Sequence, residues 1–431
     1  MRIAMVHRWP DEMRGSERSM HLAATELRKA GHEVFLLHGC ADAPRTGEAY
    51  DGAIGHPVLF DAQSKLPPAS LGLHEARVEA WLTERRVDVV HVHYPPRTDT
   101  LWRWAHAHPV VVTAHAPLCP SGLRYLWRWR KECTRTGGRL QCLGGYFHDG
   151  CGRLASGTPY GVLTFLRRIL DDRLYYLALR EVRRIIAPSE WARQRLIADG
   201  AIPHRIRVLA PPIVEPPTAP VTSLPEVAEV SDVARDAGEA DSATTRVPSA
   251  APPILLFVGH LAETKGADHA LLAAARVRHE HRLWFVGDGP LRGSLEKRAQ
   301  AMGISAKVEF FGNVAPEVLL DLRAQSTLVL VPSLWPETFG MVGAESLSAG
   351  RPVIAYDAGG VSEWLEDGRS GRIVRAGDVD ALARAVDDLL DRPALLRRMG
   401  RAGRTAALAW TPHHHATRSL EIYREALETV D

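Results

Sequence analysis

The feature that most constrains this chain is a repeated alternation of short Val- and Ile-rich runs with stretches of helical periodicity. The runs alternate only weakly between apolar and polar residues, which fits strands covered on both faces, as in a parallel sheet. Between the first two runs, residues 15–31 have apolar residues at helical spacing and end at Gly31, a typical helix stop. This βαβ unit repeats and predicts a parallel α/β fold. The expected strands of the first half are "RIAMVH", "EVFLLH", "VDVVHVHY", "VVVTAHA", "RRIIAPS" and "RIRVLAPP".

The same alternation starts again after residue 250. At 431 residues the chain is too long for one ordinary core, so two domains are expected. We expect doubly wound domains at 1–214 and 251–410, with a helix in 411–431 that crosses back to the first. The expected strands of the second half are "ILLFVGHL", "HRLWFVGDG", "KVEFFGNV", "STLVLVPS", "RPVIAYDAGG" and "SGRIV".

Residues 215–250 interrupt the pattern. They contain seven acidic residues, two arginines, several prolines and no aromatic residue. Such a segment buries too little apolar surface to offset the entropy lost on ordering, so a flexible linker or insertion is predicted. The alternative is a poorly patterned helix through "EVAEVSDVARDAGEA".

Composition excludes several classes of protein. The net charge of +2, with 24% charged residues, does not suggest a chain that binds nucleic acid as a whole. No apolar stretch approaches the roughly 18 residues of a membrane-spanning helix. The first residues read as a strand and not as a signal peptide. Five cysteines, an odd number, indicate a reducing compartment, so a cytoplasmic enzyme is expected.

Two glutamates in "WPETFGMVGAE" lie where a strand ends and a helix begins near Phe339 or Gly340. A glycine permits close approach of the backbone to a ligand, and the N–H groups of a helix start favour an anion. Glu337 on the loop and Glu345 inside the helix suit the paired hydroxyls of a sugar or ribose. The alternative is that Glu337 caps the helix and Glu345 is a solvated helix residue.

Further loops after strands carry compatible chemistry. "GHLAETKG" places Lys265 where its ammonium can meet a phosphate. "YDAGGVSEW" offers Gly359 and Gly360 for close backbone approach, and "VGDGP" follows a third strand. Ligands of doubly wound sheets bind outside the carboxyl ends of the strands. These loops therefore predict one site for an anionic, hydroxyl-rich ligand.

Together these motifs resemble the family 4 glycosyltransferases of GT-B fold. The resemblance includes the Glu-x7-Glu spacing with its Phe-Gly step, "G-x-L-x-x-x-K-G", "VGDGP", "FFGNV" and "EDGRSGRIV", in the family's order. It covers residues 254–425, and the first half more loosely. It implies two Rossmann-like domains facing a central cleft. It also implies retaining transfer of a sugar from a UDP- or GDP-sugar to a hydroxyl acceptor, with no cofactor and no catalytic metal.

The resemblance also implies roles for matching residues. Lys265 would bind the donor diphosphate, Glu337 the transferred sugar and Glu345 the ribose. His115 would contact the donor sugar across the cleft, and Val314 would lie near the base. The leaving diphosphate would help to accept the acceptor proton on the front face. The remaining donor-side residues are Gly15, His260, Phe339, Gly340, Met341, Gly359 and Gly360.

Two positions depart from the family pattern. His260 stands where relatives have arginine, which binds phosphate through two N–H groups and stays charged. Arg14-Gly15 replaces the usual Gly-Gly, although Gly15 can still lend its N–H to a phosphate. We expect weaker or pH-dependent donor binding, or a larger share for Lys265, with Arg14 as a further source of charge from the opposite wall.

The acceptor side is less defined. The candidates are Arg14, His93, Trp127 and Arg128, although a structural role fits His91 and His93 slightly better than an acceptor-side one. Residues 101–135 interleave tryptophans with basic residues, which suits peripheral contact with the inner face of a membrane. The alternatives are an aromatic platform for a sugar or plain core packing. The acceptor itself could be a lipid-linked glycan, a polysaccharide or a small-molecule natural product.

Four cysteines, Cys119, Cys133, Cys142 and Cys151, fall in one Gly-rich stretch with His148 nearby. Their clustering suggests a structural zinc ion, but the gaps are long and Cys-x-x-Cys is absent. The alternative is ordinary reduced thiols. Two other functions also stay open: a nucleotide-sugar-binding pseudoenzyme, for which His260 would be a sign, and a phosphorylase, which would need pyridoxal phosphate.

Overall fold

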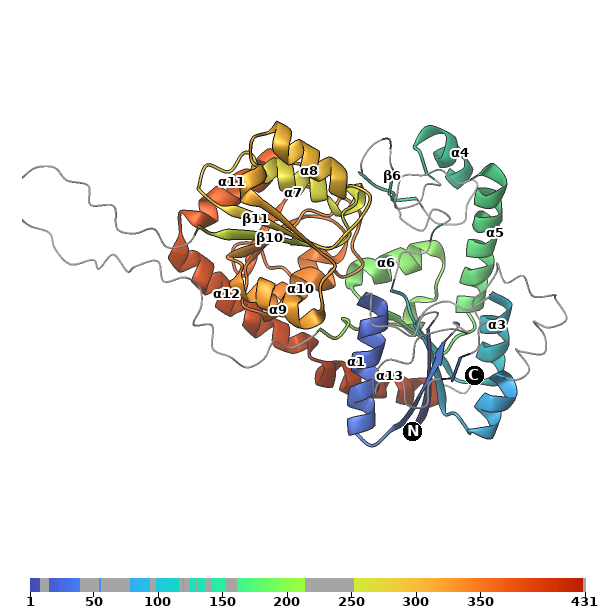
Figure 1. The fold of residues 1–431 in the computed structure, drawn as a ribbon. Coiled ribbons are helices and arrows are strands. Elements are labelled where there is room, and N and C mark those ends of the chain that lie inside the picture. Colours follow the sequence, from blue (N-terminus) through green and yellow to red (C-terminus); the bar gives the residue numbers. More distant parts are fainter. Residues whose placement is uncertain are drawn as a thin grey trace, which may run out of the picture.

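The computed structural model contains two parallel sheets, each with helices packed against it (Figure 1). The predicted linker, its helical alternative, Arg14 and Trp127 all lie outside the described residues. The structure describes residues 1–7, 15–38, 54–55, 78–93, 98–115, 119, 125–126, 128, 131–135, 141–151, 161–213 and 252–428.

The N-terminal sheet has the strand order β3-β2-β1-β4-β5-β8-β9, and all its pairings are parallel. Its central strands are buried along their whole length, as their continuous apolar sequence predicts. A separate two-stranded ribbon, β6 with β7, lies outside this sheet. The bounds are β1 Arg2–His7, β2 Glu33–His38, β3 Ile54–Gly55, β4 Val89–Val92, β5 Val110–Thr113, β6 Tyr125–Leu126, β7 Lys131–Glu132, β8 Arg184–Ala187 and β9 Ile206–Val208.

The C-terminal sheet has the order β12-β11-β10-β13-β14-β15, again with parallel pairings. The strand order reverses between β10 and β13. Crevices at such reversals are the usual ligand sites of doubly wound sheets. The bounds are β10 Ile254–Val258, β11 Arg282–Val286, β12 Val308–Gly312, β13 Leu328–Val331, β14 Val353–Tyr356 and β15 Gly371–Val374.

The helices complete two Rossmann-like lobes, which confirms the predicted fold class. The first ends near its predicted stop, with Gly31 in the left-handed region at φ 84°. The bounds are α1 Gly15–Lys29, α3 Thr98–Ala107, α4 Gln141–His148, α5 Val162–Leu179, α6 Glu190–Asp199, α7 Ala267–Ala274, α8 Arg292–Ala301, α9 Pro316–Gln325, α10 Met341–Ser348, α11 Val379–Leu390, α12 Pro393–Ala407 and α13 Pro412–Glu428.

The last helix leaves the C-terminal lobe and packs on the N-terminal one. Figure 1 shows α13, in red, beside α1 and beneath the strands of that lobe. Ile422 and Tyr423 of α13 are buried in one apolar cluster with Ile3 and Met5 of β1. The two lobes are therefore joined by a packed helix as well as by the segment before β10.

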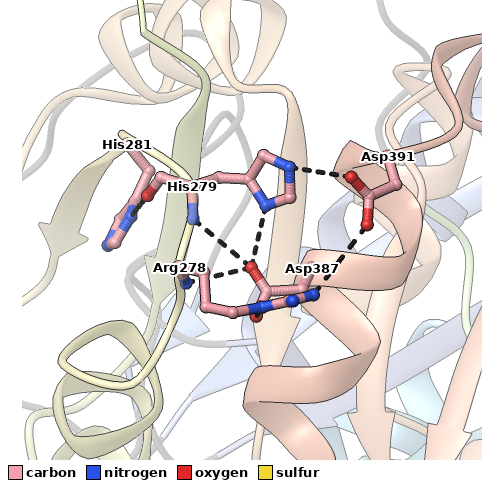
Figure 2. Close-up of polar contacts among 5 residues, drawn as sticks. All are labelled: Arg278, His279, His281, Asp387 and Asp391. Carbon is pink, nitrogen blue, oxygen red and sulfur yellow. Dashed lines mark hydrogen bonds and ion pairs between the residues drawn. The ribbon is translucent and has the colours of Figure 1, made fainter.

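A polar cluster stabilises the end of the C-terminal sheet at which its strands begin (Figure 2). Asp387 of α11 accepts hydrogen bonds from the backbone N–H of Arg278 at 3.0 Å and from Nδ1 of His279 at 2.8 Å. The other ring nitrogen of His279 lies 3.0 Å from Asp391. Because Arg282 begins β11, this cluster ties the turn between α7 and β11 to α11.

Candidate active site

The loop after β13 brings the predicted lysine and glutamate together. Lys265 Nζ lies 2.7 Å from Oε1 of Glu337, and the Ser333 hydroxyl donates to the same oxygen at 2.6 Å. The Lys265 ammonium also stands over the Trp335 ring, 5.2 Å from its centroid. Burial would raise the pKa of the Glu337 carboxyl, but Lys265 and the Ser333 hydrogen bond together lower it below its ordinary value. Glu337 is therefore an anion held next to a cation.

The glycine after Lys265 explains why the lysine reaches this place. Gly266 has φ 67°, and a Cβ there would lie 1.9 Å from the carbonyl oxygen of Pro332. Only glycine permits this conformation and this approach together. The turn that carries Lys265 is therefore pressed against the loop that carries Glu337. In the same contact, the Thr264 carbonyl accepts from the N–H groups of Leu334 and Trp335.

Helix α10 begins at Met341, with Gly340 as its N-cap in the left-handed region at φ 101°. No side chain caps this helix start, so the alternative in which Glu337 caps it is wrong. A Cβ at Gly340 would lie 2.8 Å from Nε1 of Trp364, which donates to the Phe339 carbonyl. An uncapped helix start with a glycine before it favours an anion.

Glu345 is buried inside α10, so the alternative of a solvated helix residue is also wrong. Its Oε2 accepts from Arg323 of α9 at 2.8 Å, and its Oε1 accepts from Arg18 of α1 at 3.2 Å. Arg323 is buried and Arg18 is partly exposed. The Arg18 contact crosses from the N-terminal lobe, and a Cβ on Gly15 of the same helix would lie 3.0 Å from Met341 Sδ. The starts of α1 and α10 therefore meet across the lobes.

Gly359 and Gly360 approach protein backbone closely. A Cβ at Gly359 would lie 2.2 Å from the Glu337 carbonyl oxygen, and one at Gly360 would lie 2.8 Å from that of Thr338. The Gly360 N–H donates to the Glu337 carbonyl at 2.7 Å. The glycine pair thus locks the loop after β14 to the loop that carries Glu337. This contact accounts for both glycines without a ligand.

His115 follows β5 and faces the same region from the N-terminal lobe. Its Nε2 lies 3.1 Å from Nδ1 of His93, and its carbonyl accepts from the Thr338 hydroxyl at 2.9 Å. Burial, together with the nearby His7 and His415, lowers the pKa of His115 to about 3. The His115 ring is therefore neutral near pH 7, with its backbone tied to the loop after Glu337.

The neighbouring histidines are held inside the N-terminal lobe. His91 binds the Tyr423 hydroxyl at 2.6 Å and the Thr113 hydroxyl at 2.7 Å, so both of its ring nitrogens have partners. His93 is buried, and burial lowers its pKa well below the ordinary value. His91 contacts the His93 ring, and His93 in turn contacts His115.

Three other predicted residues are placed as follows. His260 follows β10 and is exposed, while Val314 follows β12 at the opposite end of the sheet from β15. Arg128 is exposed in the ribbon region, where its guanidinium donates to the His148 carbonyl at 3.4 Å. Arg128 thus contacts the end of α4.

The structure does not assemble the considered zinc site. Among the described residues, which include all four cysteines and His148, no three His, Cys, Asp or Glu side chains could hold a metal ion together. Cys142 lies in α4, whereas Cys119, Cys133 and Cys151 lie outside the helices and strands. Burial, followed by the neighbouring Cys133 and Cys119, raises the pKa of Cys151 to about 12.

The tryptophans of residues 101–135 divide between core and surface. Trp104 is buried in the core of the N-terminal lobe, whereas Trp102 is 43% exposed. Core packing is therefore the right interpretation for Trp104. In the described part of the chain, no helix has the length and apolarity to cross a membrane.

Sequence reasoning missed Arg18 and Arg323, the two partners of Glu345. Arg323 gives no local signal, since it lies on another helix 22 residues away. Arg18 had a usable signal: it is a basic residue in the first turn of a helix that begins at a predicted phosphate-side glycine. Sequence reasoning also missed Glu363, whose carboxylate accepts from the N–H groups of Glu190 and Trp191 at the start of α6 in the other lobe.

Comparison with known proteins agrees with this geometry. A family model described as Glycosyltransferase Family 4 matches residues 13–214, and one described as Glycosyl transferases group 1 matches residues 244–406. The HepE protein of Anabaena, solved in complex with UDP, superposes with a TM-score of 0.69 at 18% identity, covering 98% of this chain and 99% of that one.

Two curated relatives come from Streptomyces kanamyceticus. Alpha-D-kanosaminyltransferase is 36% identical over 150 residues, 34% of this chain and only 39% of that protein. The 2-deoxystreptamine glucosyltransferase is 28% identical over 281 residues, 64% of this chain and 69% of that protein. With both family models matching and the fold shared along the chain, this protein belongs to the family 4 glycosyltransferases and has their GT-B fold.

Proposed function

We propose that this chain is a retaining glycosyltransferase that moves a sugar from a UDP- or GDP-sugar to a hydroxyl of a small acceptor. The observation that carries the proposal is the Lys265–Glu337 pair beside the uncapped start of α10. A cation and free backbone N–H groups suit a diphosphate, and an anionic carboxylate suits sugar hydroxyls. UDP in the HepE structure supports a uridine nucleotide as the first donor to test.

We use the order of the strands in the C-terminal sheet to propose how the donor lies. Val314 follows β12, Lys265 follows β10, Glu337 follows β13 and the glycine pair follows β14. A donor placed along these strand ends would have its base near Val314, its diphosphate near Lys265 and its sugar near Glu337. Arg18 would hold Glu345 in place while its carboxylate accepts hydrogen bonds from the ribose hydroxyls.

The chemical step would use few protein groups. The bond from the sugar anomeric carbon to the diphosphate oxygen breaks, and the acceptor oxygen bonds to that carbon on the same face. The acceptor proton passes to the leaving diphosphate oxygen. Lys265 and the N–H groups of α10 stabilise the charge that develops there. His115, being neutral, would donate or accept a hydrogen bond with a sugar hydroxyl and not a full charge.

The acceptor class rests on the relatives. The name of the 2-deoxystreptamine glucosyltransferase indicates a small aminocyclitol acceptor for that protein, which favours a small polyol here over a polymer or lipid-linked glycan. The membrane interpretation of residues 101–135 loses support because Trp104 is part of the core.

The test is turnover with defined substrates. The purified chain is incubated with UDP-glucose, UDP-N-acetylglucosamine or GDP-mannose, each with 2-deoxystreptamine, myo-inositol or D-glucose. We expect release of nucleoside diphosphate and a product whose NMR spectrum shows the donor's anomeric configuration. Lys265→Ala serves as the inactive control. Tight donor binding without turnover would instead support the pseudoenzyme, and inverted products would refute retention.

A further inference from the structure

A second hollow lies beside the candidate donor site. It is a cavity of about 520 Å³, within the ~300–1,000 Å³ range of small-molecule sites. Both lobes line it, because Glu132 comes from β7 of the N-terminal lobe and the other described residues come from the C-terminal lobe. The lining residues are Glu132, Leu334, Pro336, Asp357, Ala358, Ile373, Val374, Arg375 and Ala376.

The position of this cavity follows from the strand order. The expected donor contacts run from β12 through β10 and β13 to β14, and the cavity continues this series at the ends of β14 and β15. Its wall includes Pro336, the residue before Glu337, and Ala358, whose carbonyl accepts from the Glu337 N–H at 3.3 Å. The cavity therefore begins where the transferred sugar would end, on the side away from the base.

The walls are held in place by main-chain hydrogen bonds. The Thr264 carbonyl anchors the N–H of Leu334 at 2.9 Å, and the Asp357 N–H donates to the Val374 carbonyl at 2.8 Å. Glu132, on the opposite wall, pairs with Arg195 of α6 at 3.7 Å. A site with such fixed walls is largely formed before its ligand arrives.

The chemistry of the lining is mixed in a way that suits a ring with many hydroxyls. Leu334, Pro336, Ala358, Ile373 and Val374 offer apolar surface to ring C–H groups. Glu132 and Asp357 accept hydrogen bonds, and Arg375 donates them. Asp357 and Arg375 are exposed, so both are available at the rim.

We propose that this cavity, between β7 and the ends of β14 and β15, binds the acceptor as a small cyclic polyol, a sugar or cyclitol. The inference rests on the proposed glycosyltransferase function, and it adds where the second substrate binds. One acceptor hydroxyl would point past Pro336 toward the anomeric carbon held near Glu337. Asp357, Arg375 and Glu132 would then select the hydroxyl pattern.

The test fills the cavity without touching the donor residues. Ala376 is exposed on its lining, so Ala376→Trp adds bulk there at little cost to folding. Ala301→Trp is the matched control, because Ala301 is exposed and ends α8 at the other edge of the sheet. KM for 2-deoxystreptamine, myo-inositol and D-glucose is measured with UDP-glucose, UDP-N-acetylglucosamine and GDP-mannose. Hydrolysis of each donor is measured without acceptor.

We expect Ala376→Trp to raise acceptor KM at least tenfold and to leave donor hydrolysis and donor KM unchanged, with Ala301→Trp matching the native chain. Asp357→Ala, a smaller change, should raise acceptor KM about tenfold through one lost hydrogen bond to a charged group. Native acceptor KM in both variants would overturn the inference. So would a raised donor KM with acceptor KM unchanged, because the cavity would then hold part of the donor.

Failure of the proposed function has a different signature. In that case the native chain neither transfers sugar to any acceptor nor hydrolyses any of the three donors. Transfer by the native chain with an unaffected Ala376→Trp variant refutes only the acceptor site. Melting temperatures of the variants, read by circular dichroism, show whether each is folded when assayed.

Discussion

Two carboxylates at opposite ends of the strands of the C-terminal sheet, Asp387, which is buried, and Glu337, which is partly buried, show how the same chemistry can have different roles. Asp387, where the strands begin, is held partly by backbone N–H groups of a fixed turn (Figure 2). Glu337, where the strands end, is held by two side chains, Lys265 and Ser333. The Lys265 side chain is 32% exposed, so a ligand can compete for it.

In this fold, the position of a paired carboxylate decides its role. A ligand cannot displace the main-chain N–H groups that hold Asp387 without undoing the turn before β11. A diphosphate or a sugar can replace the side-chain partners of Glu337 at the ends of the strands, where the uncapped start of α10 also lies. We therefore expect substitutions at Glu337 to change activity and substitutions at Asp387 to change stability.

The largest effect should come from Glu337→Gln. The change keeps the size of the side chain but removes the charge that pairs with Lys265 and meets the sugar. By analogy with the loss of one stabilising group in an active site, turnover should fall by ~10²–10³. Steady-state assays with UDP-glucose measure this. Native turnover in a folded Glu337→Gln variant would show that Glu337 has no role in activity.

Asp387→Ala tests whether Asp387 serves the stability of the fold. Loss of this buried acceptor removes the partner of the Arg278 N–H and of Nδ1 of His279. The free energy of unfolding should fall by about 2–4 kcal/mol, measured by urea denaturation. Turnover of the remaining folded protein should stay native. An Asp387→Ala variant that is stable but inactive would show that Asp387 serves activity and not only stability.

Arg18→Gln sharpens the comparison with a third carboxylate, Glu345. This carboxylate lies at the same edge as Glu337 but takes one partner from the other lobe. Without Arg18 its orientation toward the ribose is less fixed, so donor KM should rise about fivefold to tenfold with little change in turnover number. This corresponds to roughly 1 kcal/mol, as for partly exposed ion pairs. An unchanged donor KM would limit Arg18 to a structural contact.

The pH dependence of stability tests Asp387 again. Burial would raise the pKa of its carboxyl, but the hydrogen bonds from His279 and Arg278 lower it below the ordinary value. A carboxyl with a lowered folded-state pKa contributes stability above its unfolded value of about 3.9, and the contribution is lost as the pH falls through the folded value. The stability gap between native and Asp387→Asn protein should therefore be constant from pH 8 to about 5 and should shrink in more acid solution. A gap that widens on acidification would contradict this account.

For His115 we expect no effect on the shape of the pH profile, the smallest of the predicted effects. Because the pKa of His115 is about 3, its ring does not titrate between pH 6 and 8. The profile of kcat/KM for the donor should therefore keep the same shape in this range when His115 is replaced by Asn, although its level should fall. A limb near pH 6.5 that disappears in His115→Asn would show that the ring is charged in the working enzyme.

The sequence predicted the fold well because the apolar runs of a buried parallel sheet are local signals. Every expected strand is present, and α10 starts where the Phe-Gly step indicates because Gly340 is its left-handed N-cap. Spacing alone left the surroundings of Glu345 open. Its partner Arg18 lies 327 positions away, a contact that only the packed lobes reveal.

Other site features could not be read from residue types. Gly359 was expected to admit a ligand, yet it admits the Glu337 backbone. Cysteine clustering suggested zinc, but it did not reveal that Asp149 pairs with Arg135 at 2.6 Å between these cysteines. The cavity beside Pro336 is lined by residues of both lobes that lie far apart in the sequence. No local sequence motif could therefore predict it.

The central claim is that the diphosphate of a nucleotide sugar rests at the strand ends between Lys265 and the start of α10. A crystal structure of the complex with UDP tests it most directly. We predict phosphate oxygens within hydrogen-bond distance of Lys265 Nζ and of the first N–H groups of α10, with the ribose on Glu345. UDP bound elsewhere, with the Lys265–Glu337 and Arg18–Glu345 pairs unchanged, would contradict the account.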